Sequence, residues 1–335
     1  MLVCVTGGTG FVGSHSVQAL TRAGHRVRLL ARDPSLVDVD AETIADVVAG
    51  DVTDEAAVAR AVKGVDAVLH AAAVYSFDSR RHAEMRRVNT RGAEVVLGAA
   101  RRAGVGRIVH VSTVGALYPA PPGVIGPTSP VGRPRETYLA SKAGAEEVAR
   151  GHQLDGVPVV ITYPPAMAGP ADPHLGDQNA RIRDVLRGLM PMWPTGGFPL
   201  GDVRDTAELH LRALTAPDVG GRHFGPGRYV ATREFLGALR EVTGRPLRAA
   251  YLPARAMLPA ARLADLAQRW WPWHIPAQYG AVYTCAVATP VDASASTLGV
   301  EARPLAATMR DTVRWLRETG RITARQAGAG RAAAR

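Results

Sequence analysis

A tyrosine and a lysine stand four residues apart in the segment Tyr138-Leu139-Ala140-Ser141-Lys142. The segment has a helical pattern, and residues four apart share one face of a helix. Because the chain has eight tyrosines but only two lysines, chance seldom produces this pair. A phenol has a pKa of about 10, and a neighbouring ammonium group lowers it by favouring the phenolate. We therefore predict that Tyr138 and Lys142 form an acid–base pair that exchanges a proton with a carbonyl or alcohol oxygen.

Two hydroxyl side chains stand at the end of the strand predicted over residues 107–112. They belong to Ser112 and Thr113. Thr113 is placed to hydrogen-bond a substrate oxygen and orient it against Tyr138, and Ser112 is the rival for this role. The structural alternative is that these hydroxyls only cap backbone groups at the strand end.

A glycine-rich turn, Thr6-Gly7-Gly8-Thr9-Gly10-Phe11-Val12-Gly13, joins the first predicted strand to an amphipathic helix. Gly7 permits the tight turn, Gly10 lets the backbone approach a pyrophosphate, and Gly13 lets helix and strand pack closely. The helix start at Phe11 and Val12 offers free N–H groups and a partial positive charge to phosphates. A glycine turn in this context predicts a dinucleotide site.

The end of the second predicted strand bears on the choice between NAD and NADP. A carboxylate there usually binds the ribose hydroxyls of NAD. Here Ala31 holds the position and Arg32 follows, and a guanidinium group can fork onto a 2′-phosphate. This favours NADP(H) over NAD(H). Two alternatives stay open: Arg32 is a solvated surface residue, or a shifted strand end brings Asp33 near the ribose.

Two more strand ends are predicted to contribute to the cofactor pocket. Asp51, followed by Val52, comes after the third strand, where its carboxylate can accept a hydrogen bond from the adenine amino group. The fourth strand ends at His70, followed by Ala71 and Ala72, whose small side chains leave space for the cofactor. A packed strand-end histidine explains His70 equally well.

Apolar runs that fit strands alternate with amphipathic stretches that fit helices through the first half of the chain. The predicted strands are Leu2–Thr6, Arg26–Ala31, Ala45–Val48, Ala67–His70, Arg107–Ser112 and Val157–Tyr163. The predicted helices are Phe11–Ala23, Glu55–Val62, Arg81–Ala103, Arg135–Leu154 and, near the end, Ala306–Thr319. This alternation predicts an α/β fold, a Rossmann doubly wound parallel sheet with helices on both faces.

The pattern changes after Tyr163, where prolines and glycines interrupt it. We assign residues 1–163 to an NAD(P)-binding domain, to which residues 200–217 return. We assign residues 164–199 and 218–320 to a smaller, irregular C-terminal substrate lobe. The small and basic stretch 321–335 is predicted to be a disordered tail.

Composition excludes several other classes of protein. The 335 residues are 47% hydrophobic but contain no uncharged apolar run long enough to span a membrane. Two cysteines provide no disulfide framework and no signal peptide is expected, so we predict a cytoplasmic protein. The net charge of +10 is spread over many arginines, which predicts no nucleic-acid partner. The histidines lack metal-ligand spacing, so no metal is expected.

With these motifs placed, the chain resembles the extended short-chain dehydrogenase/reductase family, also described as the NAD-dependent epimerase/dehydratase family, from residue 1 to about residue 320. Besides the glycine turn and the Tyr–Lys pair, its marks include the segments at 88–92, 169–170 and 203–205. The resemblance implies that Asn89 supports the active-site water and the lysine. It also implies that Tyr163, where many relatives have arginine, Pro164 and Ala166 belong to the loop that covers the nicotinamide. Finally, it implies a homodimer built on the helices at 81–103 and 135–154.

Within that family the segment Ala31-Arg32-Asp33-Pro34 is similar to dihydroflavonol reductase-like, cinnamoyl-CoA reductase-like and 3β-hydroxysteroid dehydrogenase-like members. They imply NADPH-dependent reduction of a ketone or aldehyde, or the reverse oxidation, on a fairly apolar small molecule. Val114-Gly115 replaces the Asp-Glu pair of nucleotide-sugar dehydratases, which argues against dehydration. A nucleotide-sugar epimerase holding NAD tightly and a non-catalytic NADP sensor are the alternatives.

Three tryptophans, Trp270, Trp271 and Trp273, lie in an apolar segment of the predicted lobe. They are expected to line an apolar substrate pocket or to pack the lobe. Contact with a membrane surface is the least favoured interpretation.

Overall fold

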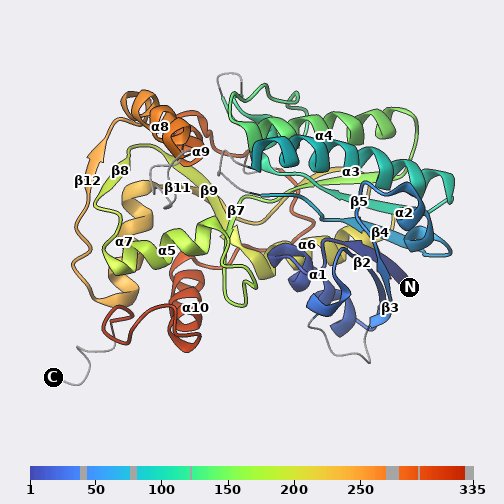
Figure 1. The fold of residues 1–335 in the computed structure, drawn as a ribbon, viewed down its shortest axis with the longest axis horizontal. Coiled ribbons are helices and arrows are strands. Elements are labelled where there is room, and N and C mark those ends of the chain that lie inside the picture. The colour runs from blue at the N-terminus through green and yellow to red at the C-terminus, as the bar shows by residue number, and fades with distance from the viewer. Residues whose placement is uncertain (38–43, 76–80, 121–122, 269–278, 293–294, 329–335) are drawn as a thin grey trace.

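The computed structural model describes residues 1–37, 44–75, 81–120, 123–268, 279–292 and 295–328. Figure 1 shows a layered domain of sheet and helices that contains the N-terminus, and a lobe at the opposite end that carries α5, α7, α8 and α10. The predicted α/β fold class is confirmed, since a parallel sheet with helices on both faces is its centre.

Seven strands of the described residues form that sheet, in the order β10-β6-β5-β4-β1-β2-β3, and every pairing is parallel. They are β1 (Leu2–Thr6), β2 (Arg26–Ala31), β3 (Ile44–Ala49), β4 (Ala67–His70), β5 (Arg107–Val111), β6 (Val159–Tyr163) and β10 (Gly221–Phe224). The strand order reverses between β1 and β4. In such sheets ligands bind outside the carboxyl ends of the strands at this point.

Helices cover both faces of the sheet. On one face α3 (His82–Arg102) and α4 (Thr137–Leu154) lie side by side, and α2 (Glu55–Val62) packs against α3 (Figure 1). On the other face α1 (Phe11–Arg22) packs against α6 (Val203–Thr215). Because both faces are covered, the strands read as continuous apolar runs rather than alternating ones.

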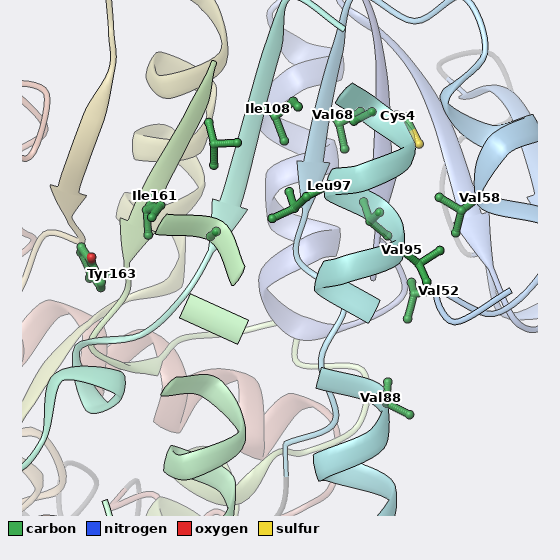
Figure 2. Close-up of a cluster of buried hydrophobic side chains, with 14 of the residues drawn as sticks. Cys4, Val52, Val58, Val68, Val88, Val95, Leu97, Ile108, Ile161 and Tyr163 are labelled. Atoms are coloured by element: carbon green, nitrogen blue, oxygen red, sulfur yellow. The ribbon is translucent and has the colours of Figure 1, made fainter. Parts of the chain in front are cut away.

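The main core lies between the sheet and the helices α3 and α4. Figure 2 shows Val68 and Ile108 from the strands together with Val95 and Leu97 from α3. All four side chains are buried. Burying each side chain of this size stabilises the fold by roughly 1.5–3 kcal/mol. This packing fixes the strand ends and the start of α4, which carry the candidate site.

The C-terminal lobe contains more regular structure than the sequence predicted. Its helices and strands are β7 (Ala166–Ala168), α5 (Asp177–Arg187), β8 (Met192–Pro194), β9 (Gly197–Asp202), β11 (Arg228–Ala231), α7 (Thr232–Thr243), β12 (Ala250–Leu252), α8 (Ala254–Gln268), α9 (Tyr279–Val287) and α10 (Leu305–Glu318). β11, β9 and β7 form one small sheet, and β12 pairs with β8. The prolines and glycines after Tyr163 therefore separate short elements and do not mark an irregular region.

Two parts of the expected domain division differ from the structure. The range 218–320, assigned to the lobe, includes β10, which pairs with β6 in the large sheet. The prediction of a disordered tail from residue 321 onward is wrong for residues 321–328. Ile322 is only 4% exposed, and the carbonyl oxygens of Arg321 and Gln326 accept hydrogen bonds from arginines of the lobe. Residues 329–335 lie outside the described residues.

Candidate active site

A cavity of about 490 Å³ runs from the carboxyl ends of the strands to the lobe. It joins the glycine turn at one end to Tyr138 and the lobe residue Phe198 at the other. The predicted site residues that line it are Gly7, Gly10, Phe11, Val12, Gly13, Arg32, Asp51, Val52, Ala71, Ala72, Ser112, Thr113, Tyr138, Lys142, Pro164 and Ala166. Residues far apart in the sequence are thus brought to one cavity.

His70 and Tyr163, which we expected to contact the cofactor, lie behind the cavity wall. His70 is 2% exposed, and its Nδ1 is 2.8 Å from the hydroxyl oxygen of Thr6, as expected for a packed strand-end residue. The Tyr163 hydroxyl donates to Glu146 Oε1 at 2.5 Å, and its ring stacks on Phe224. The large apolar ring of Tyr163 is therefore part of the core.

The glycine turn has the geometry that a dinucleotide needs. Gly7 has φ +75°, and a Cβ on it would lie 2.6 Å from the backbone nitrogen of Ala72. A Cβ on Gly13 would overlap the carbonyl oxygen of Gly7. Gly10 caps α1 without a side-chain hydrogen bond, so the first N–H groups of the helix stay available to phosphates. The residues present therefore fit a dinucleotide.

Arg32 and Asp33, which follow β2, have different surroundings in the structure. Arg32 lines the cavity, with 67% of its side chain exposed and an Nη1 atom 3.9 Å from Glu84 Oε1. Asp33 caps the short 3-10 helix η1 (Pro34–Leu36), where its Oδ1 accepts hydrogen bonds from the backbone N–H and the hydroxyl of Ser35. The Asp33 carboxylate is therefore engaged by its own turn.

Asp51 lines the same end of the cavity. Partial burial raises its pKa, but hydrogen bonds from the backbone N–H and the hydroxyl of Thr53, together with the charges of Arg32 and Arg87, lower the pKa overall. The Asp51 side chain is thus an ionised acceptor with a fixed orientation, as contact with the adenine amino group requires.

At the other end, α4 presents Tyr138 and Lys142 on one face. The carboxylate of Glu136 caps the helix by accepting hydrogen bonds from the backbone N–H groups of Tyr138 and Leu139, at 2.9 and 2.8 Å. Lys142 is 5% exposed, and its Nζ donates to the carbonyl oxygen of Val111 at 2.6 Å. Burial lowers the pKa of Lys142 to about 8, against the opposing effect of the Glu146 carboxylate.

The pKa of Tyr138 differs from the expectation that a neighbouring ammonium lowers it. Burial raises this pKa, and the carboxylates of Glu136 and Asp177 raise it further. The protein by itself therefore keeps the phenol protonated. This protonation state suits proton donation better than proton abstraction.

The polar side chains around this pair have distinct partners. Thr113 caps the short 3-10 helix η3 (Val114–Leu117), and its hydroxyl donates to the carbonyl oxygen of Pro164 at 3.3 Å. The Ser112 hydroxyl is buried at the cavity wall and has no hydrogen-bond partner among the described residues. The capping role weighed for Thr113 is therefore present, and Ser112 keeps an available hydroxyl.

Asn89 lies behind the cavity, on the buried side of α3. Its Oδ1 accepts from the backbone N–H of Val74 at 2.7 Å. Its Nδ2 donates to the carbonyl oxygen of Val74 at 3.0 Å and to the hydroxyl of Ser141 at 2.9 Å. Asn89 therefore links the loop after β4 to the helix that carries Tyr138 and Lys142.

Several cavity residues were not found from the sequence. They are Tyr75, Tyr118, His174, Asp177, Gln178, Asn179 and Thr284. Five of them lie in the ranges 164–199 and 218–320 that were assigned to the substrate lobe, where the sequence pattern does not place individual side chains. Asp177 offered a local signal, because an aspartate is favoured in the first turn of a helix such as α5.

Three further expectations concern the tryptophans of the lobe, a metal site and a membrane span. Trp270, Trp271 and Trp273 lie outside the described residues. Within the described ranges there is no cluster of three or more histidines, cysteines or acidic residues that could hold a metal ion. No described helix has the length and apolar character needed to cross a membrane.

A doubly wound sheet, a glycine turn and a Tyr–Lys pair on one cavity define a nicotinamide-dependent enzyme of the extended short-chain dehydrogenase/reductase type. The model of the NAD dependent epimerase/dehydratase family matches residues 3–227, and the chain belongs to this family.

Curated relatives cover most of the chain. It is 31% identical to sterol demethylase protein B of Methylococcus capsulatus, over 96% of this chain and 100% of the relative. It is 33% identical to a putative dihydroflavonol 4-reductase of Synechocystis, over 72% of each chain. It is 30% identical to a ketoreductase of Stigmatella aurantiaca that acts on a farnesyl dihydroquinoline oxide, over 79% of this chain and 80% of the relative.

Solved structures share the fold. The structure of gox2253 superposes with a TM-score of 0.78 at 28% identity, covering 96% of this chain and 99% of that one. A dTDP-glucose 4,6-dehydratase from Streptomyces venezuelae with NAD bound superposes with a TM-score of 0.72 at 26% identity, over 95% and 97%. Family and relatives together support a nicotinamide nucleotide as the cofactor.

Proposed function

We propose that this chain is an NADP(H)-dependent oxidoreductase that reduces a ketone or aldehyde on a fairly apolar small molecule, or catalyses the reverse oxidation. The observation that carries the proposal is a single cavity that joins the glycine turn to Tyr138 and Lys142. A dinucleotide held by its pyrophosphate at the turn would have its nicotinamide end within the same cavity as the Tyr–Lys pair.

The bound dinucleotide supplies or accepts the hydride. Lys142, which lines the cavity, would hold the nicotinamide ribose by hydrogen bonds from its ammonium group. Tyr138 donates its phenolic proton to the carbonyl oxygen of the substrate as the carbon is reduced. Ser112 and Thr113 orient that oxygen. The raised pKa of Tyr138, caused by burial, is consistent with a phenol that donates its proton in the reductive direction.

Arg32 supports NADP(H) over NAD(H). Its guanidinium group lies at the cavity and is largely exposed, whereas Asp33, the carboxylate that would repel a 2′-phosphate, is held by Ser35. An exposed guanidinium fork can bind a phosphate in a bidentate manner, here in exchange for the long contact with Glu84.

The cavity wall and the relatives support an apolar substrate. Tyr118, Leu139, Met167 and Phe198 line the substrate end. The names of three relatives refer to a sterol, a dihydroflavonol and a farnesyl dihydroquinoline oxide. The apolar part of this wall would bind such molecules by removing their surface from water, and polar residues such as Asp177 and Asn179 lie beside it.

The test is a screen of apolar ketones and aldehydes with NADPH and NADH side by side, after any copurified cofactor has been identified. Turnover with NADPH that is lost in Tyr138→Phe, with dinucleotide binding retained, is the expected result. Tightly retained NAD, with no carbonyl reduced, would contradict the proposal and favour a nucleotide-sugar epimerase.

We also propose a homodimer through α3 and α4, which lie side by side on one outer face of the sheet (Figure 1). A pairing of two such faces makes a four-helix bundle. The mass in solution, measured by light scattering, tests this directly.

We also propose a cytoplasmic location, because both cysteines of the chain are free and buried and the fold uses no disulfide.

A further inference from the structure

Four functional groups follow one another at four-residue intervals along α4: Tyr138, Lys142, Glu146 and Arg150. Residues at this spacing are neighbours on one helix face. Tyr138 and Lys142 line the cavity, whereas Glu146 and Arg150 continue the row beyond it. Glu146 is fully buried, with 0% of its surface exposed. A buried carboxylate beside the lysine has no role in the mechanism above.

Two hydrogen-bond donors hold the carboxylate of Glu146 in place. Arg150 Nε donates to Glu146 Oε1 at 2.7 Å, and the Tyr163 hydroxyl donates to the same oxygen at 2.5 Å. Arg150 is itself held by the carbonyl oxygen of Ser129 and by the Tyr163 hydroxyl. Figure 2 shows Tyr163 at the carboxyl end of β6. Hydrogen bonds from a guanidinium on α4 and a phenol on β6 therefore fix the position of the Glu146 side chain.

The other groups around Lys142 bring little charge of their own. His70 on β4 and His110 on β5 face the lysine. Burial lowers the pKa of His70 to about 3 and holds that of His110 well below its ordinary value, so both rings are neutral. Tyr138 is a neutral phenol. Among the described residues, Glu146 is the carboxylate that raises the pKa of Lys142.

We propose that Glu146 is a positioning residue that keeps Lys142 in its ammonium form within a buried site, and that Arg150 and Tyr163 hold Glu146 in place for this purpose. The catalytic meaning of the ammonium rests on the proposed function, but the charge relationship itself does not. An isolated buried lysine loses its proton readily because burial disfavours the charged form. A buried carboxylate one turn away opposes that loss without touching substrate or cofactor.

The chain allows a direct test because it has only two lysines, Lys63 and Lys142. Protein labelled with ¹³C-lysine gives two side-chain resonances, which Lys63→Arg assigns. Their pH titration without cofactor or substrate reports the Lys142 ammonium alone. Glu146→Gln is expected to lower the Lys142 midpoint by about 1 pH unit or more, as the loss of a close opposite charge requires.

Glu147→Gln is the matched control, because Glu147 is the next residue on α4 and is exposed. It should leave the Lys142 midpoint unchanged. If Glu146→Gln does not fold, Glu146→Asp decides, since it withdraws the carboxylate by one methylene group and should lower the midpoint part of the way. An unchanged Lys142 midpoint in the folded variant overturns the proposal.

Turnover distinguishes this inference from the proposed function. If carbonyl reduction is found, the alkaline limb of the kcat/KM profile should move to lower pH in Glu146→Gln, together with the resonance. If the midpoint moves but no carbonyl is reduced, the charge relationship stands and the proposed function fails.

Discussion

The ring of Tyr75 stands edge-on to the ring of Tyr138, with centroids 4.7 Å apart and planes at 79°. Tyr75 lies in the loop after β4, and Tyr138 lies in the first turn of α4. An edge-to-face pair contributes about 0.5–1.5 kcal/mol beyond its buried area. A second element of the fold therefore restricts the orientation of the Tyr138 phenol.

Tyr75→Ala should lower kcat by about tenfold, since a loss of about 1.4 kcal/mol in alignment corresponds to that factor. Dinucleotide affinity should stay within about twofold, because the contact is to the phenol ring and not to the glycine turn. Steady-state kinetics and a binding titration measure the two effects. Tyr75→Phe keeps the ring and should retain most of the activity. Equal losses in both variants would show that the ring contact does not matter.

Arg32→Ala should weaken NADPH binding by about tenfold or more and leave NADH binding nearly unchanged, because a phosphate–guanidinium fork is lost only with NADPH. Titrations monitored by nicotinamide fluorescence measure both affinities. Arg22→Ala, on exposed surface of α1, is the control for a general loss of positive charge. Similar weakening of NADPH and NADH would mean that Arg32 does not select the cofactor.

The sequence alone located the parts of the site whose function depends on local spacing. The glycine turn and the Tyr138–Lys142 pair each lie within one turn or one helix, so their geometry follows from that element. The strands and helices of the first half were predicted to within a few residues for the same reason. β3, for example, is Ile44–Ala49 where Ala45–Val48 was predicted.

Features that depend on contacts distant in sequence could not be predicted. Tyr163 is the last residue of β6, at the edge of the sheet where the cavity lies. Its ring nevertheless packs into the core, because it stacks on Phe224 and its hydroxyl donates a hydrogen bond to Glu146. The cavity wall near Tyr138 is assembled from α5, α9 and the loop after β4, and no local sequence pattern indicates how these elements pack together. Ile322 likewise becomes part of the lobe core only because α10 places it there.

Asn89→Ala should destabilise the fold by about 2–3 kcal/mol, because it leaves a buried N–H and C=O of Val74 and the Ser141 hydroxyl with one partner fewer. Denaturant unfolding measures the loss. Ser141→Ala removes one of these contacts and should cost less. A loss below about 0.5 kcal/mol for Asn89→Ala would contradict a structural role for this amide.

Acid should destabilise the protein through its buried histidines. Burial lowers the pKa of His210 to about 3 in the folded protein, whereas its value in the unfolded chain is about 6.5. As the pH falls below about 6.5, the unfolded chain therefore binds a proton that the folded protein does not bind. Stability contributed by neutral His210 is present above pH about 6.5 and is lost as the pH falls.

His210→Gln keeps a polar group near Ser16 and Thr162 but cannot titrate. Its unfolding free energy should fall less steeply between pH about 6 and 4, by up to about 1.4 kcal/mol per pH unit. Equilibrium unfolding at several pH values gives both slopes. His25→Gln, at a partly exposed position, should change the slope less. Parallel curves for His210→Gln and the wild-type protein would disprove the assignment.

Gly13→Ala tests the close packing that makes the dinucleotide turn. The new Cβ would overlap the carbonyl oxygen of Gly7, so helix α1 or the turn must shift away from the phosphate position. Dinucleotide affinity should fall by at least about a hundredfold, which corresponds to roughly 2.7 kcal/mol of lost phosphate contacts. Calorimetric titration measures this affinity.

Gly151→Ala is the matched control, because a Cβ at this position of helix α4 meets nothing within 4 Å. That variant should bind normally and gain up to about 1 kcal/mol of stability from helix propensity. Near-normal affinity in Gly13→Ala would mean that the turn tolerates the shift and that the dinucleotide does not depend on this glycine.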